Sequence, residues 1–423
     1  MNSKIEQIEN FVLLTYAIFL PISLTVSEVL LIVGTILSLL QLVLTRLSGP
    51  QAGSTKFSLP PLTVPLALLT LAITVSGAYN GYETPGLFGT QSLAEAGRSL
   101  YDLLWTLLPY FWAFSVFHRN KALAISAIIL LLWTSSLAGI WGSIQQIFDI
   151  HPGKFKYLQG TGFHSNPMAF GGQMQIFSMI ALGLLLGNGY RELDKNCLHS
   201  FMKPVLTYSQ NTFVFLFIVA ANLAGLYFAV ERNTWLGGVA GVLALSLLKS
   251  WRIFAIAIAS LAAAASASWF FVDVVRHRIE ILFSGTDVSV TARQKIWSEC
   301  LNQYYPRSPV FGIGWMKFPH FDIPEAIVPG VSKELIHAHS NYIQFLTTTG
   351  ICGLASFIML TIWTIVLSVK RYNYAMKEAD CVASSLRLGC LGVAVSIAVS
   401  GIFEFNFGSA QVRLAQWFVL ALL

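Results

Sequence analysis

The chain alternates long apolar runs with short polar segments from end to end. The runs are about 17–25 residues long, enough for helices to cross about 30 Å of hydrocarbon. They lack the alternation of a β-barrel, and lipid leaves no other way to satisfy the backbone, so we expect helices. We predict an all-α polytopic membrane protein with about twelve transmembrane helices. These lie near 8–25, 28–46, 60–79, 99–117, 122–143, 165–187, 211–230, 233–249, 252–272, 341–369, 384–404 and 407–423.

Composition supports a membrane protein. Of 423 residues, 55% are hydrophobic and only 11% are charged, and the mean hydropathy is +0.66. Soluble domains carry about 25% charged residues. No basic and aromatic module accompanies the net charge of +6, so we expect no nucleic-acid partner. The five cysteines are scattered, which supports neither a disulfide framework nor a CxxC metal site.

Basic residues in the short loops predict the orientation, because they favour the cytoplasmic side. One set of alternate loops is rich in them, including Arg119, Lys121, Lys249, Arg252, Lys370, Arg371, Lys377 and Arg387. The other set holds chiefly Lys154, Lys156 and Arg232. We therefore expect both termini inside and the long polar segment outside.

The chain divides into three regions that we expect to form one integrated domain: helices one to nine (1–272), the external segment (273–338) and helices ten to twelve (339–423). The external segment has too little apolar mass for its own core. Thr291 to Gln294 has the form of a capping box, which predicts the start of an amphipathic helix. Its apolar stripe consists of Ile296, Trp297, Cys300, Leu301 and Tyr304, and it ends before Pro306.

Two arginines are candidate anion ligands. Arg293 precedes Ile296 and Trp297 by three and four residues, which places it on the packing face of the predicted helix. It needs an anion there, either a ligand or a carboxylate such as Asp287 or Glu299. Arg232 lies in a tight external link, where arginine serves as an interfacial anchor or as a phosphate ligand.

His339 falls at the start of the tenth predicted span, with Ser340 or Asn341 as the N-cap. The positive end of a helix disfavours imidazolium, so the ring is suited to accept a proton as a general base. A structural role at the helix start is the alternative. His337 and His339 share a face only in a strand, and no nearby residue completes a zinc-like set, so we expect no metal.

Glu404 is an acidic residue at the outer end of the eleventh predicted span. Ionisable residues at the membrane edge are costly, which makes a functional role the default hypothesis. Three roles stay open: orienting His339, accepting a hydrogen bond from a sugar hydroxyl, and pairing with Arg232 or Arg293.

These motifs resemble the O-antigen ligase and O-antigen polymerase family of bacterial envelope glycosyltransferases. His339-Ser340, followed after nine residues by Gly350-x-x-Gly353, resembles the pattern of the ligases, and residues 337–344 resemble the family's HxHN-type box. Arg293 to Trp297, followed by Gly312 and Gly314, looks like its arginine-tryptophan helix and glycine loop. The segment around Arg232 is similar to its S/T-R-x-x-W/L segment, although Glu231 and Asn233 depart from the usual small residues.

The resemblance implies an integral-membrane glycosyltransferase of the GT-C-like class in the inner membrane of a Gram-negative bacterium. A ligase moves glycan from undecaprenyl diphosphate to a sugar hydroxyl of lipid A–core at the periplasmic face. By matching position, Arg232 and Arg293 hold the donor diphosphate and His339 activates the acceptor. His337, Ser340, Trp297 and Glu404 are supporting candidates. The resemblance implies a single inverting displacement without metal, and we expect no cofactor.

Three other activities compete with the ligase. An O-antigen polymerase or a protein O-oligosaccharyltransferase uses the same donor, and the spacing of the histidine motif favours the ligase. The end of the chain at Leu423 disfavours the oligosaccharyltransferase, which usually carries extra external mass. A transporter of the lipid-linked glycan belongs to a different class. Transporters place polar groups near the bilayer midplane, whereas here they gather at one surface.

Overall fold

The computed structural model describes residues 2–47, 59–83, 93–150, 159–196, 202–284, 287–315 and 337–423. Lys154 and Lys156, used in the orientation argument, lie outside these residues. Over the described part of the chain the regular structure is helical and no strand occurs. The helices before the polar segment are α1 (Asn2–Phe19), α2 (Leu24–Leu47), α3 (Thr63–Glu83), α4 (Leu93–Arg119), α5 (Lys121–Ile147), α6 (Pro167–Gly187), η1 (Gly189–Asn196), α7 (Lys203–Ser209), α8 (Thr212–Phe228), α9 (Arg232–Lys249) and α10 (Trp251–Phe271). The remainder are α11 (Asp273–Ser284), α12 (Val288–Glu299), η2 (Cys300–Tyr304), η3 (Tyr305–Arg307), α13 (Asn341–Lys377), α14 (Cys381–Ser400), η5 (Asn406–Gly408) and α15 (Ala410–Leu420).

The all-α membrane architecture is confirmed, because each of the twelve predicted ranges contains a helix. Seven helices among the described residues are long and apolar enough to cross a membrane, and the count is eight if the bent pair α7 and α8 forms one span. The others are shorter or less apolar; α15, for example, has 11 residues. The chain is therefore a multi-pass membrane protein, and twelve crossings remain a prediction.

Helices α6 and α14 form the centre of the bundle. Of the residues in the most apolar segment of each helix, 83% are buried in α6 and 72% in α14. They pack closely at Gly183 and Gly389: a Cβ on Gly183 would lie 2.4 Å from the backbone nitrogen of Gly389. Small residues allow such backbone contact, which replaces the hydrophobic driving force that lipid does not supply. This rigid centre ends in the turn that carries Glu404.

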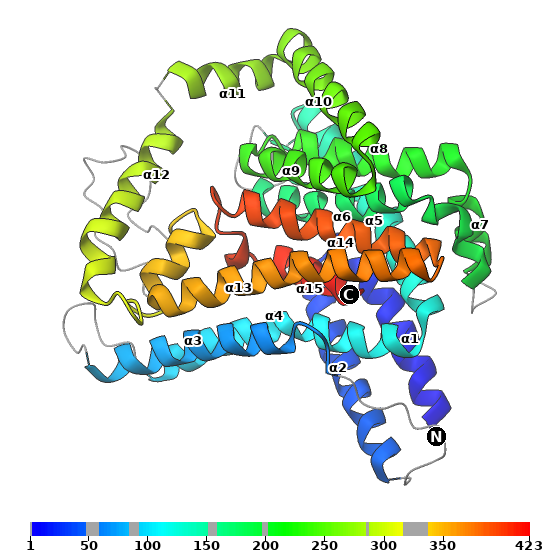
Figure 1. The fold of residues 1–423 in the computed structure, drawn as a ribbon, viewed down its shortest axis with the longest axis horizontal. Helices are drawn as coiled ribbons and strands as arrows, with labels where there is room; N and C mark the ends of the chain where they lie inside the picture. The colour runs from blue at the N-terminus through cyan, green and yellow to red at the C-terminus, as the bar shows by residue number, and fades with distance from the viewer. Residues whose placement is uncertain are drawn as a thin grey trace.

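Helices α10, α11 and α12 form a strap that leaves the bundle beside α9 and returns to it near the start of α13 (Figure 1). None of the residues of α10 is buried, so this apolar helix offers its surface to lipid. The strap places α12, and with it Arg293, against the first turn of α13. Within the polar segment, α12 and the loop after it contact the turn before α13 and α13 itself, and one integrated domain stays a prediction.

Helix α13 is broken at Gly350, where φ is +64° and ψ is −164°. The carbonyls of Thr347 and Thr348 accept the N–H groups of Ile313 and Gly314, each at 3.0 Å. In return, the Ile351 N–H donates to the carbonyl of Pro309 at 2.9 Å. The break thus fastens the loop that follows α12 to α13. The segment that approaches Gly350 closely is therefore this loop and not another helix.

Replacing Gly350 with alanine is expected to lower the thermal stability of the protein and its activity together. The new Cβ would lie 2.3 Å from the carbonyl oxygen of Val310, and a left-handed backbone costs a non-glycine residue about 1–3 kcal/mol. Thermal melting in detergent measures the effect. Gly97→Ala is the control, because nothing lies within 4 Å of its added Cβ. Equal melting temperatures for the two variants would contradict the role assigned to the break.

Candidate functional site

The site is built on the turn that precedes α13. His339 has φ +48°, a left-handed conformation that histidine adopts more readily than most residues. Both polar groups of Ala338 are fixed: its N–H donates to Gln344 Oε1 and its carbonyl accepts the Trp297 indole N–H, each at 2.8 Å. Ser340 is the N-cap, accepting the Ile343 N–H at 3.3 Å, which confirms one of the two predicted caps. The turn therefore holds His339 immediately before the N-cap of α13.

Helix α12 is bound to this turn through Trp297 and a small apolar cluster of Ile296, Cys300, Ile313 and Ala338. The predicted amphipathic helix is present, but the predicted capping box is wrong. The helix begins at Val288, and its N-cap is Asp287, whose carboxylate accepts the Val290 N–H at 3.0 Å. Leu301 was expected on the buried stripe and is 41% exposed, because the helix changes to π geometry at Cys300.

Glu404 lies in the turn after α14, and only 4% of it is exposed. Its Oε2 is 3.2 Å from His339 Nδ1, so the structure supports the first role foreseen for it. Asn341 positions this turn: its backbone N–H donates to the Gly401 carbonyl at 2.7 Å, and its side-chain oxygen accepts the Phe407 N–H at 3.1 Å. Burial alone would raise the pKa of Glu404. The hydrogen bond and charge of His339, with the charges of His337 and Arg293, outweigh burial and lower the pKa to about 2.

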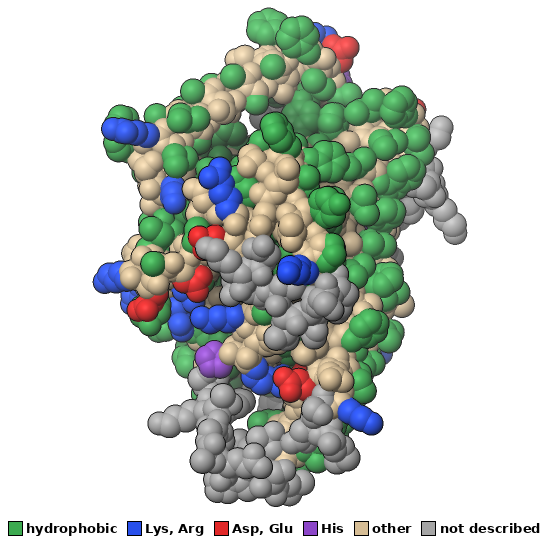
Figure 2. Space-filling model, turned by 90° about the vertical axis from the view of Figure 1, so that its right-hand side faces the viewer, with side chains coloured by type: hydrophobic (Ala, Val, Ile, Leu, Met, Phe, Trp, Pro, Cys, Tyr) green, Lys and Arg blue, Asp and Glu red, His purple; other side chains and the backbone are tan. Residues whose placement is uncertain are grey.

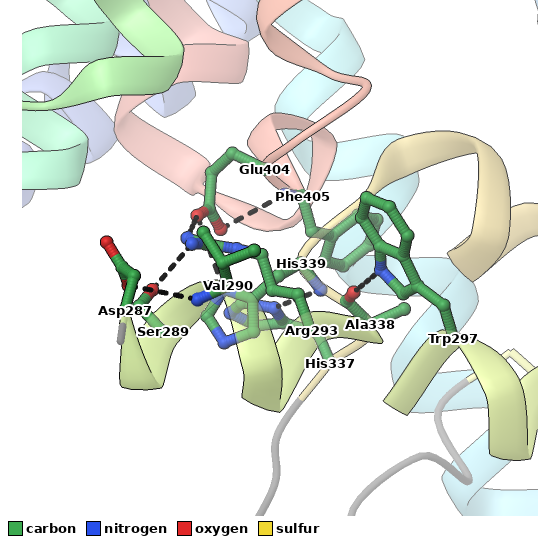
Figure 3. Close-up of polar contacts among 10 residues, drawn as sticks. All are labelled: Asp287, Ser289, Val290, Arg293, Trp297, His337, Ala338, His339, Glu404 and Phe405. Atoms are coloured by element: carbon green, nitrogen blue, oxygen red, sulfur yellow. Dashed lines mark hydrogen bonds and ion pairs between the residues drawn. The ribbon is translucent and has the colours of Figure 1, made fainter. Parts of the chain in front are cut away.

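Arg293 reaches the same carboxylate from α12 (Figure 3). Its guanidinium nitrogen lies 3.5 Å from Glu404 Oε2 and another donates to Ser289 Oγ at 2.6 Å. The side chain is 17% exposed, and its Nε is buried without an acceptor among the described residues. The carboxylate partner of Arg293 is therefore Glu404, which confirms one of the pairings foreseen for Glu404, and not Asp287 or Glu299.

Arg232 begins α9 and pairs with Asp287, the N-cap of α12. Burial would raise the pKa of Asp287, but the hydrogen bonds from Arg232 and from the Val290 N–H lower it, so the carboxylate is ionised at neutral pH. Arg232 thus binds the N-cap of α12, and Arg293 lies six residues further along the same helix, about 9 Å along its axis. The structure places Arg232 beside the site but not on Glu404.

His337 completes the cluster. Its Nδ1 accepts the backbone N–H of His339 at 3.2 Å, which helps to hold the strained turn. Burial, together with the charges of His339 and Arg293, lowers the pKa of His337 to about 4, although Glu404 opposes the shift. The ring is therefore neutral at pH 7.

The ligand atoms of His337, His339 and Glu404 lie within 4.8 Å of one another, a set that could hold a metal ion. The sequence argument found no acidic residue near the histidines; the fold supplies one from 65 residues further along the chain. A cation there would compete with the Arg293 guanidinium for the same carboxylate oxygen. The fixed positive charge beside it weakens the site for a divalent ion.

Several functional contacts were missed by the sequence reasoning, namely those of Asp287, Ser289, Asn341 and Gln344. Asn341 and Gln344 lie in residues 337–344, the segment that resembles the HxHN-type box. Their spacing from His339 was the available signal. Ser289 is four residues from Arg293, a helical spacing that was also an available signal. The ion pair of Asp287 with Arg232, 55 residues away, carried none.

The chain is similar to a known family over part of its length. Residues 214–358 match the family model described as O-antigen ligase. The match includes Arg232, Arg293, His337 and His339, whereas Glu404 lies beyond it. Comparison with curated proteins finds no match to this chain.

Proposed function

Because the chain belongs to the O-antigen ligase family through residues 214–358, we propose that it is a ligase that uses undecaprenyl-diphosphate-linked glycan. The acceptor is a sugar hydroxyl of lipid A–core. The reaction takes place at the periplasmic face of the inner membrane of a Gram-negative bacterium, with both termini cytoplasmic and twelve crossings. The convergence of Arg293, His339 and Glu404 at one end of the bundle carries this proposal.

His339 is the proposed general base. Glu404 accepts a hydrogen bond from the Nδ1–H of His339, which leaves the lone pair of Nε2 for the acceptor hydroxyl. The acceptor oxygen forms a bond to the anomeric carbon as the bond from that carbon to the diphosphate oxygen breaks. The hydroxyl proton passes to Nε2, and the anomeric centre inverts. The carboxylate of Glu404 then stabilises the imidazolium.

The arginines act on the leaving group. Charge develops on the diphosphate as its bond to the sugar breaks, and fixed guanidinium groups stabilise that charge. Arg293 has its unused Nε for this purpose. Arg232 contacts the diphosphate when the donor either displaces Asp287 or binds the exposed edge of the Arg232 guanidinium. The side chain of Arg232 is 21% exposed.

The test uses purified protein in detergent with lipid-linked glycan and lipid A–core, with and without EDTA. Transfer to lipid A–core that EDTA does not reduce supports the ligase and the absence of a metal. Lengthening of the lipid-linked glycan instead would make the protein a polymerase. Movement of donor across a liposome membrane without transfer would replace the enzyme by a carrier.

Replacing Arg232 with glutamine is expected to lower kcat/KM for the donor by about 10- to 150-fold, the worth of one charge-assisted hydrogen bond of about 1.5–3 kcal/mol. Asp287→Asn is the matched control. It preserves the N-cap and removes the ion pair while Arg232 keeps its guanidinium. Its loss of kcat/KM should therefore be clearly smaller than that of Arg232→Gln. Equal losses in both variants would mean that Arg232 only fastens α12.

A further inference from the structure

A second polar region lies at the opposite end of the bundle, where a cavity of about 310 Å³ opens between the ends of α4, α5, α13, α14 and α15. Asp380 and Arg387 lie at the beginning of α14, and Glu404 follows its end. The 20 residues of α14 separate the two regions by about 30 Å. The cavity is therefore distinct from the candidate active site.

The polar wall of the cavity is mostly cationic. It consists of His118, Lys121, Arg371 and Arg387, with Asp380 as the acidic member among the described residues. Asp380 lies 3.9 Å from Lys121 Nζ, a lysine whose side chain is 80% exposed. The two arginines are half-buried, and Arg387 donates to the backbone carbonyl of Arg371 at 3.2 Å. Within the described part of the chain neither guanidinium has an ion-pair partner.

The rest of the wall is apolar and includes Phe114, Phe117, Ile125, Leu386 and Leu422. The cavity also lies at the ends of α5, α13 and α14, three of the candidate membrane spans. Figure 2 looks onto this end of the bundle, where Lys and Arg side chains lie among acidic ones beside broad hydrophobic areas. The cavity thus combines cationic side chains with an apolar wall at the ends of candidate membrane spans.

We propose that this cavity binds an anionic phospholipid, with Arg371 and Arg387 holding the phosphate and the apolar wall receiving the upper part of an acyl chain. Arginine forms paired hydrogen bonds with phosphate oxygens, and basic pockets between membrane helices are suited to anionic headgroups. A free phosphate would use the arginines but not the apolar wall. The charge and the amphiphilic lining together therefore select a lipid.

The experiment titrates the purified, delipidated full-length protein in non-ionic detergent with phosphatidylglycerol or phosphatidylcholine, and counts bound lipid by native mass spectrometry. Wild type should bind phosphatidylglycerol at least about 10-fold more tightly than phosphatidylcholine. Arg371→Gln with Arg387→Gln should remove that preference, because each charge-assisted contact is worth about 10-fold or more. Arg252→Gln, an exposed arginine outside the cavity, should keep it.

Two further variants keep the test independent of folding defects. Asp380→Asn retains the α14 N-cap and removes the acidic charge, so it should tighten phosphatidylglycerol binding. Ala383→Trp fills the cavity and leaves both arginines, so it should weaken binding. Equal binding of the two lipids, or an unchanged preference in the double arginine variant, would overturn the proposal. Binding of inorganic phosphate as tightly as phosphatidylglycerol would also overturn it, in favour of a simple anion site.

Discussion

Replacing His339 with alanine is expected to reduce glycan transfer by about 10²- to 10⁴-fold, the usual contribution of a general base. The fold should survive, because the His339 side chain is 28% exposed and belongs to neither apolar cluster. Removing the ring also removes a hydrogen bond to Glu404, but the Arg293 guanidinium still neutralises the negative charge of Glu404. The measurement is the initial rate of transfer to lipid A–core, with thermal melting of the same preparation.

The control is His277→Ala, an exposed histidine on α11 outside the site. It should transfer at the wild-type rate. His339→Gln adds a second comparison, because an amide can position a hydroxyl but cannot take its proton at neutral pH. If the glutamine variant worked nearly as well as wild type, His339 would position the acceptor and the base would have to be sought elsewhere.

Local patterns predicted the helices of this protein well. Each apolar run became a helix, and Ser340 became a cap, because hydrophobic length and capping chemistry act within a few residues. The packing face of α12 was also predicted correctly for Ile296, Trp297 and Cys300. These features depend on neighbours in the sequence, which a single chain displays.

Such reasoning offered several possible partners for the charged groups but could not choose among them. Asp287 was considered for Arg293 and instead binds Arg232, and Glu404 joins His339 from the far side of α13 and α14. The same distance hid the set of His337, His339 and Glu404. A histidine and a glutamate 65 residues apart meet only because α13 and α14 run antiparallel and return the chain to the same end. The sequence identified the charged groups, and the fold determines which of them pair.

Replacing Arg293 with glutamine is also expected to have a large effect. It should lower kcat/KM for the lipid-linked donor by about 10- to 150-fold. The loss should appear with the diphosphate donor because the guanidinium acts on the leaving group. Thermal melting must accompany the kinetics, since the change removes the guanidinium that pairs with the buried carboxylate of Glu404. Removing one member of a buried pair commonly costs about 3–5 kcal/mol.

A double substitution separates the two roles of Arg293. The reference for the double variant is Glu404→Gln alone, because the Glu404 carboxylate also holds His339. If Arg293 only neutralises Glu404, adding Arg293→Gln to Glu404→Gln should cost no further transfer. If Arg293 binds the diphosphate, the double variant should be at least about 10-fold slower than Glu404→Gln. We expect the second result, because Arg293 Nε has no acceptor within the described part of the chain. Equal rates of the double variant and Glu404→Gln would instead assign Arg293 to the support of Glu404 and leave the donor diphosphate to Arg232.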